Sequence, residues 1–486
     1  MKRIVFLFLA ASAAAFAFLF GNEADEINPA DLAILATALI AILALQTVLL
    51  LLVFRGFRTL GRERLGLTVS KYASAALFAC NAFHTAFITF DAAPHGQMLM
   101  ALAAAGLLLT ALLVQKWQSF ALFMMTAYFV MSLGLYGYTR LAMRPTAEAG
   151  QAPMKISSSR NVYLIGSESL HSAKAFRDLY GARDLPHEDY LRSSGFRVLD
   201  RAYSADYTTL RNYARLFDFE RDVSDDDIMA KVPFNRGNST FRMFDDSGYR
   251  TQFIYKTTYF GLNPDLVDYA FPKAAFYQCE FVPEEFFYFL CRKPVRKAIN
   301  ERLFGARPLT PDIIRGRLEA AQVGKPWFTF VHLSHPFHTP VNHTYEDTKA
   351  VEAFKLRLRE ALPGIAEKNF AATVGTIVKR DPGAVIIAIG DHGASLTRGA
   401  DLETPVDQFT QSEILEDRLG VMVAVYPRDF CANRIFEGST TTYLMESVAK
   451  CLNGDDAPTA QDKTRSRIFF WDGKRNLDQY AGARAP

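Results

Sequence analysis

Three apolar runs of the chain lead into side chains that can ligate a metal ion or transfer a proton. Glu168 closely follows the run NVYLI, Asp391 and His392 follow the run AVIIAI and one glycine, and His332 lies inside the run WFTFVHL. Two carboxylates that converge without a cation repel each other and are poorly solvated. A divalent cation between them makes the interaction attractive, and a mixed oxygen and nitrogen donor set suits Zn²⁺ or Mn²⁺. These residues therefore predict one divalent-metal site, provided that the fold brings them together.

The apolar runs themselves indicate how the fold does so. Four runs have the length and composition of buried strands: residues 161–165, 327–333, 384–389 and 420–426. Helix-like stretches lie between them, for example over residues 348–362 and 370–379. Continuous apolar strands that alternate with helices favour a parallel sheet covered on both faces. Such sheets bind ligands at the carboxyl ends of their strands, which is where Glu168 and Asp391 would project.

The first 143 residues differ in composition from the rest. Fifteen of them are Asp, Glu, Lys or Arg, against 90 of the remaining 343, which excludes both one soluble domain and a purely integral membrane protein. A membrane-spanning helix needs roughly 20 mostly apolar residues. Five stretches meet or approach this length: residues 4–20, 32–54, 72–90, 98–114 and 120–138. The first stretch could instead be a signal peptide.

Lysine and arginine mark alternate ends of these stretches. Basic residues precede the first span and follow the second and the fourth, whereas residues 21–31 and 91–97 contain none. The positive-inside rule then places the N-terminus in the cytoplasm and everything after the fifth span outside. We therefore expect a five-span transmembrane domain over residues 1–143, a linker over 144–160 and an extracytoplasmic domain over 161–486. The net charge of +3 gives no reason to expect a nucleic-acid partner.

Four of the five cysteines lie in the polar part, at Cys279, Cys291, Cys431 and Cys451. An even number outside the cytoplasm indicates two disulfides, with three possible connectivities. Short loops favour the pairs 279–291 and 431–451. No CxxC pair is present, which disfavours a zinc site built from cysteines.

Four motifs occur in a definite order: NVYLIGSES (161–169), AYSADYTTLRNYARLF (202–217), FTFVHLSHPFHTP (328–340) and VIIAIGDHG (385–393). Their order and spacing resemble the sulfatase-like branch of the alkaline phosphatase superfamily. In particular they resemble the membrane-anchored phosphoethanolamine and phosphoglycerol transferases, including the lipoteichoic acid synthases, which also join five spans to an extracytoplasmic catalytic domain. The resemblance implies an N-terminal five-helix transmembrane bundle and an α/β sulfatase-like domain with a mainly parallel central sheet.

The resemblance also implies a role for individual residues. Glu168, Asp391 and His392 match metal ligands of the family. Thr209 in TLRNYARLF matches the nucleophile, with Thr208 as the adjacent alternative. A threonine hydroxyl is a poor nucleophile at its free pKa, and metal coordination is one way to activate it. We therefore expect Thr209 to be both nucleophile and metal ligand.

Three histidines in the third motif are candidates for a substrate-facing role. His335 matches the family position, and His332 and His338 are its neighbours. A protonated histidine there would steady a phosphate or protonate a leaving oxygen, whereas the alternative is a structural hydrogen bond. Lys256 in IYKTTYFG is a candidate phosphate contact, with a solvated surface lysine as the alternative.

The resemblance implies a two-step reaction at the outer side of a bacterial inner membrane. Thr209 would take the head group of a membrane phospholipid, phosphoethanolamine or phosphoglycerol, and pass it to a cell-envelope glycan or glycolipid. The chain lacks the C/S-x-P-x-R motif of sulfatases, which disfavours sulfate-ester hydrolysis through formylglycine. It also has no histidine in the segment ASLTRGADLETPVDQ after DHG, where phosphoethanolamine transferases commonly have one. Hydrolysis of a phosphate or sulfate ester therefore stays open as the alternative, and a non-catalytic membrane component is a third reading.

Overall fold

The computed structural model describes two compact units of the chain. One consists of Met1–Glu148 and Ala275–Gly305, the other of Ala149–Ala274 and Ala306–Pro486. In the first unit the described residues are 51–66, 68–69 and scattered positions between 37 and 49 and between 294 and 302. In the second they are 154–182, 184–219, 238–255, 260, 267–271, 311–320, 324–333, 348–396, 409–457, 467–470 and 473–476.

The five predicted spans lie almost entirely outside the described residues. Within the described part of the chain, no helix is both long and apolar enough to cross a membrane. The five-span bundle and the domain boundaries therefore stay predictions.

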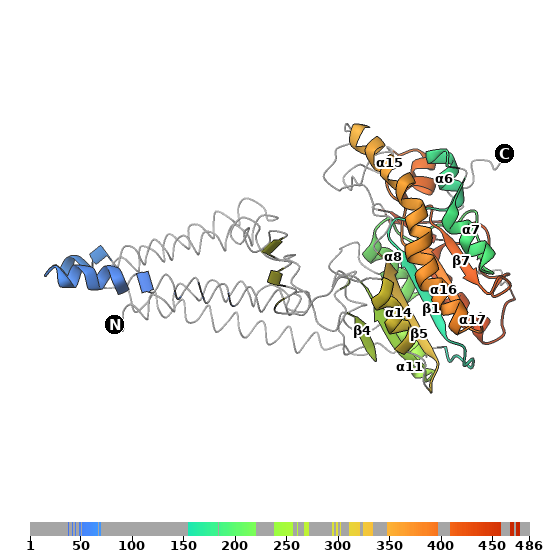
Figure 1. The fold of residues 1–486 in the computed structure, drawn as a ribbon, viewed down its shortest axis with the longest axis horizontal. Helices are drawn as coiled ribbons and strands as arrows, with labels where there is room; N and C mark the ends of the chain where they lie inside the picture. The colour runs from blue at the N-terminus through green and yellow to red at the C-terminus, as the bar shows by residue number, and fades with distance from the viewer. Residues whose placement is uncertain are drawn as a thin grey trace. The chain divides into compact units, whose positions relative to one another are not determined.

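A seven-stranded sheet forms the centre of the second unit, in the order β2-β7-β6-β1-β5-β3-β4 (Figure 1). Its strands are β1 Val162–Ser167, β2 Arg197–Val198, β3 Arg250–Ile254, β4 Tyr269–Phe271, β5 Trp327–Leu333, β6 Val385–Gly390 and β7 Val423–Tyr426. β1 pairs in parallel with β5 and β6, and β3 pairs in parallel with β5 and β4. The mainly parallel sheet predicted from the apolar runs is confirmed. A separate hairpin joins β8 Arg467–Phe470 to β9 Gly473–Asn476.

The fourth apolar run does form a strand, but its predicted direction is wrong. β7 runs antiparallel to both β6 and β2. The chain leaves β6 and enters β7 at the same edge of the sheet, where the Gly390 N–H donates to the Met422 carbonyl and the Gly393 N–H to the Arg418 carbonyl. A chain that re-enters a sheet at the edge where it left must run in the opposite direction. Buried apolar residues do not encode that choice.

Helices cover both faces of the sheet, because alternate residues of each strand point to opposite faces. Val162 and Leu164 of β1 pack in one hydrophobic cluster, and Tyr163 and Ile165 pack in the other. The first cluster includes residues of α8 Thr209–Asp218, α11 Ser239–Asp246 and α17 Leu444–Leu452. The second includes residues of α6 Ala173–Tyr180, α7 Pro186–Ser193, α14 Pro311–Ala320, α15 Thr348–Gly364 and α16 Gly375–Arg380.

Both predicted helical stretches are helical, within one longer element. α15 continues through the π-helical segment Ile365–Val374 into α16. Pro363 lies just before the π-helical segment, and a proline cannot donate the backbone hydrogen bond that continues an α-helix.

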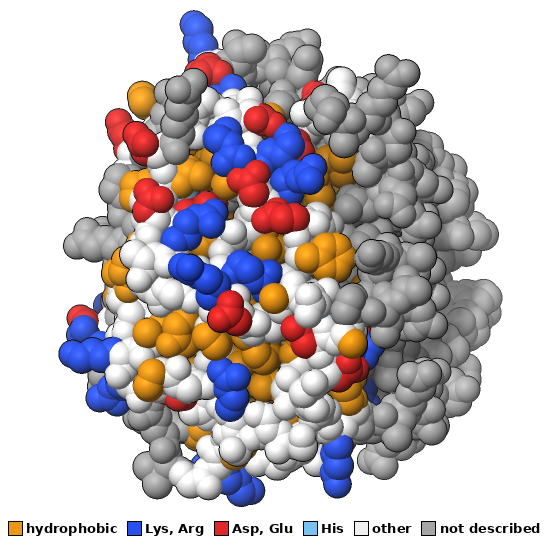
Figure 2. All heavy atoms as spheres, turned by 90° about the vertical axis from the view of Figure 1, so that its right-hand side faces the viewer, with side chains coloured by type: hydrophobic (Ala, Val, Ile, Leu, Met, Phe, Trp, Pro, Cys, Tyr) orange, Lys and Arg blue, Asp and Glu red, His pale blue; other side chains and the backbone are white. Residues whose placement is uncertain are grey.

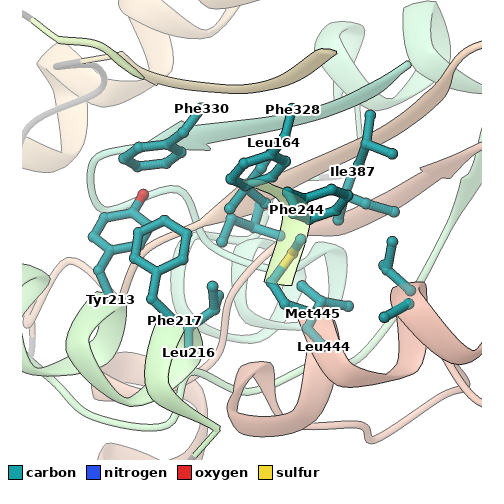
Figure 3. Packing of buried hydrophobic residues seen from close by; sticks show 14 of the residues in the cluster. Leu164, Tyr213, Leu216, Phe217, Phe244, Phe328, Phe330, Ile387, Leu444 and Met445 are labelled. Carbon is teal, nitrogen blue, oxygen red and sulfur yellow. The ribbon is translucent and has the colours of Figure 1, made fainter. Parts of the chain in front are cut away.

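Aromatic rings dominate the cluster beneath α8 (Figure 3). Phe328 of β5 stacks on Phe244 of α11 at 4.2 Å between ring centroids, and Phe330 meets Phe217 of α8 edge to face at 5.1 Å. This packing fixes α8 against the sheet and thereby fixes the position of Thr209, the first residue of α8.

The outer surface of this unit mixes charge types. Figure 2 shows basic and acidic side chains interspersed on one face, with hydrophobic side chains between them. On the described part of that face neither sign forms a continuous stripe, in keeping with the small net charge of the chain.

Candidate active site

The predicted ligands meet at the carboxyl edge of three neighbouring strands. β1 lies between β5 and β6, and its Gly166 pairs with His332 on one side and Ile389 on the other. The next pair, Ser167 with Gly390, is the last on the β6 side. Glu168 and Asp391 follow directly, so they occupy adjacent places at the same edge of the sheet.

Asp391 is completely buried, and its two carboxylate oxygens have different surroundings. Oδ1 accepts hydrogen bonds from the backbone N–H groups of Ser169 at 2.7 Å and of His392 at 2.8 Å. Ser169 adopts a left-handed backbone conformation with φ 56°, which places its N–H in the tight turn after β1. Such strained conformations persist where the surrounding structure requires them, often at functional sites.

The second oxygen, Oδ2, has no hydrogen-bond partner among the described residues. It lies 3.7 Å from Nε2 of His332 and 3.8 Å from Nε2 of His392, both too long for hydrogen bonds. Burial raises the pKa of Asp391, but the nearby imidazoles and the Ser169 N–H outweigh it and lower the pKa to about 2. Asp391 is therefore an ionised carboxylate at neutral pH with one oxygen free to bind a cation.

Thr209 is the first residue of α8, and its Oγ1 lies 3.1 Å from Nε2 of His392. His392 Nδ1 lies 2.6 Å from the carbonyl oxygen of Gly393. A carbonyl only accepts, so Nδ1 is the donor of this contact, and in the tautomer with its proton on Nδ1 the ring presents the Nε2 lone pair toward Thr209. The alternative, Thr208, instead has its hydroxyl 3.5 Å from Asp206 Oδ1. Of the two adjacent threonines, Thr209 is thus the one that contacts His392.

The loops after β1 and β6 hold each other in place. A Cβ on Gly390 would lie 1.9 Å from the backbone oxygen of Leu170, so only glycine fits there. The buried His171 accepts a hydrogen bond at Nε2 from the Ala394 N–H at 3.0 Å. Burial is the largest influence on His171 and lowers its pKa, which favours the neutral ring. The same Nε2 lies 3.1 Å from the Asp417 carbonyl oxygen, so the tautomer decides which of the two contacts is a hydrogen bond. The sequence interpretation missed His171, and its position three residues after Glu168 is the only signal that could have indicated it.

The donor atoms fit a divalent cation. Two ligands that each lie about 2.0–2.3 Å from one ion are at most roughly 4.6 Å apart. The three separations around Asp391 Oδ2 and His392 Nε2, of 3.1, 3.7 and 3.8 Å, all meet that limit. The free, buried Oδ2 is itself the strongest sign, because a buried carboxylate oxygen without a partner is unfavourable unless a cation or donor reaches it. His332, predicted as a catalytic histidine, lies 3.7 Å from Asp391 Oδ2, but it does not form a trio with Asp391 and His392 whose ligand atoms all lie within 4.8 Å of one another.

The predicted trio of Glu168, Asp391 and His392 does not meet the distance limit for a shared ion in the described part of the chain. Within the described residues, the only three His, Cys, Asp or Glu side chains whose ligand atoms all lie within 4.8 Å of one another are Cys431, Cys451 and Asp456. The two cysteines of that trio are bonded to each other and are not thiolates, so the trio is not a metal site. Glu168 is only partly buried.

Other predicted residues lie outside the described part of the chain. These are His335, His338, Lys256, Cys279 and Cys291. The Cys431–Cys451 disulfide, in contrast, is present, with a Cα–Cα separation of 5.5 Å. It links α17 to the loop after β7.

No protein-family model and no curated protein matches the chain. Among similar solved structures, the C-terminal periplasmic domain of EcEptC from Escherichia coli in complex with Zn has 12% identity and a TM-score of 0.40, and covers 68% of this chain and 94% of that chain. The integral membrane lipooligosaccharide phosphoethanolamine transferase A from Neisseria meningitidis has 12% identity and a TM-score of 0.40, with 92% and 95% covered. An alkaline phosphatase superfamily protein from Vibrio parahaemolyticus has 15% identity and a TM-score of 0.38, with 67% and 76% covered. The Neisseria protein is a phosphoethanolamine transferase and the Vibrio protein is a member of the alkaline phosphatase superfamily, the two groups named for the four motifs above.

Proposed function

We propose that this chain is a metal-dependent phosphotransferase that moves the head group of a membrane phospholipid onto a cell-envelope glycan or glycolipid. The head group would be phosphoethanolamine or phosphoglycerol, carried on Thr209 between donor and acceptor. The observation that carries the proposal is the contact of Thr209 Oγ1 with His392 Nε2, beside the free oxygen of Asp391. One buried hydroxyl, one imidazole and one carboxylate with an unpartnered oxygen are parts that a metal-dependent phosphoryl-transfer site needs.

Each of these residues has a task that its position supports. Thr209 Oγ1 attacks the phosphorus, the bond from phosphorus to the diacylglycerol oxygen breaks, and phospho-threonine forms. The acceptor oxygen then attacks the same phosphorus, and Thr209 regains its hydroxyl. Thr209 lies at the N-terminus of α8, where the helix dipole and the first backbone N–H groups favour the negative phosphoryl group.

The proton lost by the attacking hydroxyl must reach the leaving oxygen. His332 is buried, and its Nε2 has no hydrogen-bond partner among the described residues, so it can take and return a proton. Glu168, Asp391, His392 and Thr209 would hold the Zn²⁺ or Mn²⁺. The bound cation supplies positive charge that makes the Thr209 hydroxyl easier to deprotonate and offsets charge on the phosphoryl oxygens.

Thr209→Ala tests the proposal, with Thr208→Ala as the matched control. Full-length protein is incubated with a phospholipid labelled in its head group and with envelope extract. We expect Thr209→Ala to abolish both labelled product and labelled protein, while Thr208→Ala keeps both. Normal transfer by Thr209→Ala would refute the assignment.

Hydrolysis at the same site is the second candidate, favoured by the absence of histidine in the segment after DHG. Omitting the envelope extract separates the two functions. Head-group release that does not depend on an acceptor indicates a hydrolase. We further propose that the chain lies in the bacterial inner membrane with this domain in the periplasm, which would bring Thr209 near its lipid donor.

A further inference from the structure

Tyr213 is a buried polar residue next to the site that the reaction above does not use. It lies on α8 four residues after Thr209, and its side chain is completely buried. Aromatic rings surround it, with Phe330 at 5.0 Å, Phe260 at 5.5 Å and His332 at 5.6 Å between centroids. Among the described residues its hydroxyl oxygen Oη has no hydrogen-bond partner.

The Tyr213 hydroxyl occupies the space of a missing side chain in the central strand. A Cβ on Gly166 would lie 1.9 Å from Oη and 3.5 Å from Cδ2 of His332. Figure 3 shows the phenol reaching from α8 toward the sheet beside Phe330. Gly166 stands two residues before Glu168, and its partner Ile389 stands two residues before Asp391. Because side chains two residues apart share a face, the hydroxyl lies on the same sheet face as the two acids.

Burial and the charges of the two acids act on the Tyr213 hydroxyl in the same direction. Burial raises the pKa of Tyr213 well above 10, and the charges of Asp391 and Glu168 raise it further. The phenol therefore keeps its proton and is a donor at every physiological pH. Its unpartnered hydroxyl and the unpartnered Asp391 Oδ2 are a donor and an acceptor on one face of the sheet.

A purely structural residue would not need this hydroxyl. The ring contacts of Tyr213 would be the same for phenylalanine, and an unsatisfied buried hydroxyl costs free energy. Carboxylates that ligate metals are commonly held by hydrogen bonds from neighbouring groups, which orient them.

We propose that Tyr213 is a positioning residue of this site: its hydroxyl donates a hydrogen bond to the Glu168–Asp391 carboxylate pair when the divalent cation is bound. The inference rests on the proposed function, since it assumes the metal. It adds a residue that orients the ligands from α8, on the same face of the sheet. Loss of such an orienting hydrogen bond weakens metal binding by about 10–100-fold.

Metal affinity of the full-length protein tests this inference directly. Zn²⁺ and Mn²⁺ are titrated separately, in competition with a chromophoric chelator, into wild type, Tyr213→Phe and Tyr249→Phe. Tyr249 is a suitable control because it is also a buried tyrosine of the same cluster, and its hydroxyl donates to the Ser158 carbonyl at 2.8 Å. It lies just before β3, at the opposite end of the parallel strands from the site.

We expect Tyr213→Phe to raise the metal Kd about 10–100-fold, and Tyr249→Phe to leave it unchanged. Head-group transfer by Tyr213→Phe should recover with excess metal, which a purely structural defect would not do. Equal metal affinity of wild type and Tyr213→Phe overturns the inference and leaves the proposed function intact. A wild-type protein that binds neither metal overturns both.

Discussion

Gly166→Ala should destabilise the protein by colliding with one identifiable atom. The new Cβ would lie 1.9 Å from Tyr213 Oη, whereas carbon and oxygen atoms normally stay about 3.5 Å apart. Tyr213 cannot move aside easily, because it is completely buried among aromatic rings. Overpacking of this kind costs typically about 1–3 kcal/mol, and the rigid surroundings favour the upper end.

Tyr213→Phe should relieve most of that cost. Without the hydroxyl, the nearest ring atom to the new Cβ is Cζ at 3.0 Å, so the overlap falls to about 0.5 Å by the same contact distance. We expect Gly166→Ala to cost about 3 kcal/mol in wild type and about 1 kcal/mol in the Tyr213→Phe background. The two substitutions should therefore couple by about 2 kcal/mol.

A double-mutant cycle measures this coupling from urea denaturation midpoints of the full-length protein in detergent. Gly316→Ala in α14 is the matched control, because a Cβ there meets no atom within 4 Å. It should be neutral or stabilise by up to about 1 kcal/mol, since alanine is the better helix former. Effects of Gly166→Ala and Tyr213→Phe that add to within about 0.5 kcal/mol would refute the packing argument.

Three further predictions concern stability and the elements that support the site. Burial raises the pKa of Glu188 from 4.5 to about 7, so the folded state binds its proton more tightly than the unfolded state, and the resulting stability is complete below pH 4.5 and lost as pH rises through 7. Glu188→Gln should therefore raise the free energy of unfolding at pH 8 by at most about 3 kcal/mol, seen as a higher melting temperature, and should not raise it at pH 4.5. Equal shifts of the melting temperature at both pH values would contradict this. Replacing Cys431 and Cys451 by serine removes a cross-link between residues 20 apart. It should lower the free energy of unfolding by about 3 kcal/mol, and an unchanged urea midpoint would contradict this. Arg215→Met removes the partner of the buried Asp206, which lies 3.3 Å away, and should lower the free energy of unfolding by about 3–5 kcal/mol. Adding Asp206→Asn should recover much of that loss. A double variant as unstable as the single one would argue against a paired charge.

The strands that carry the site were predictable because they are buried on both faces. β1, β5 and β6 must be apolar at every position, so each appears as an unbroken run bounded within two residues of its true ends. β7 has the same composition, and its antiparallel direction comes from the connection after His392, which no apolar run encodes. Three strands of the sheet were missed. β2 and β4 have only two or three residues, which carry no periodicity, and β3 begins with the polar residues Arg250, Thr251 and Gln252, so it is not a continuous apolar run.

Some residues of the candidate site could likewise be predicted from the sequence, and others could not. Glu168 and Asp391 could be placed together because each directly follows a buried strand, and strand ends meet at one edge. Tyr213 and His171 were missed because their importance depends on what they face in the folded chain. In the sequence Tyr213 is one more aromatic residue of an amphipathic helix, and only the gap at Gly166 sets it apart.

α8 connects the hydrophobic core to the chemistry proposed here. Tyr213 is fixed among aromatic rings, and Thr209 lies four residues earlier on the same helix, about 6 Å along its axis. Because a helix moves as a rigid rod over one turn, any repacking around Tyr213 shifts Thr209 relative to His392. A displacement of about 1 Å at a reacting atom can reduce a rate about 100-fold. Core substitutions beneath α8 should therefore lower transfer activity more than their effect on stability suggests, whereas substitutions of equal cost in the cluster on the other sheet face should not.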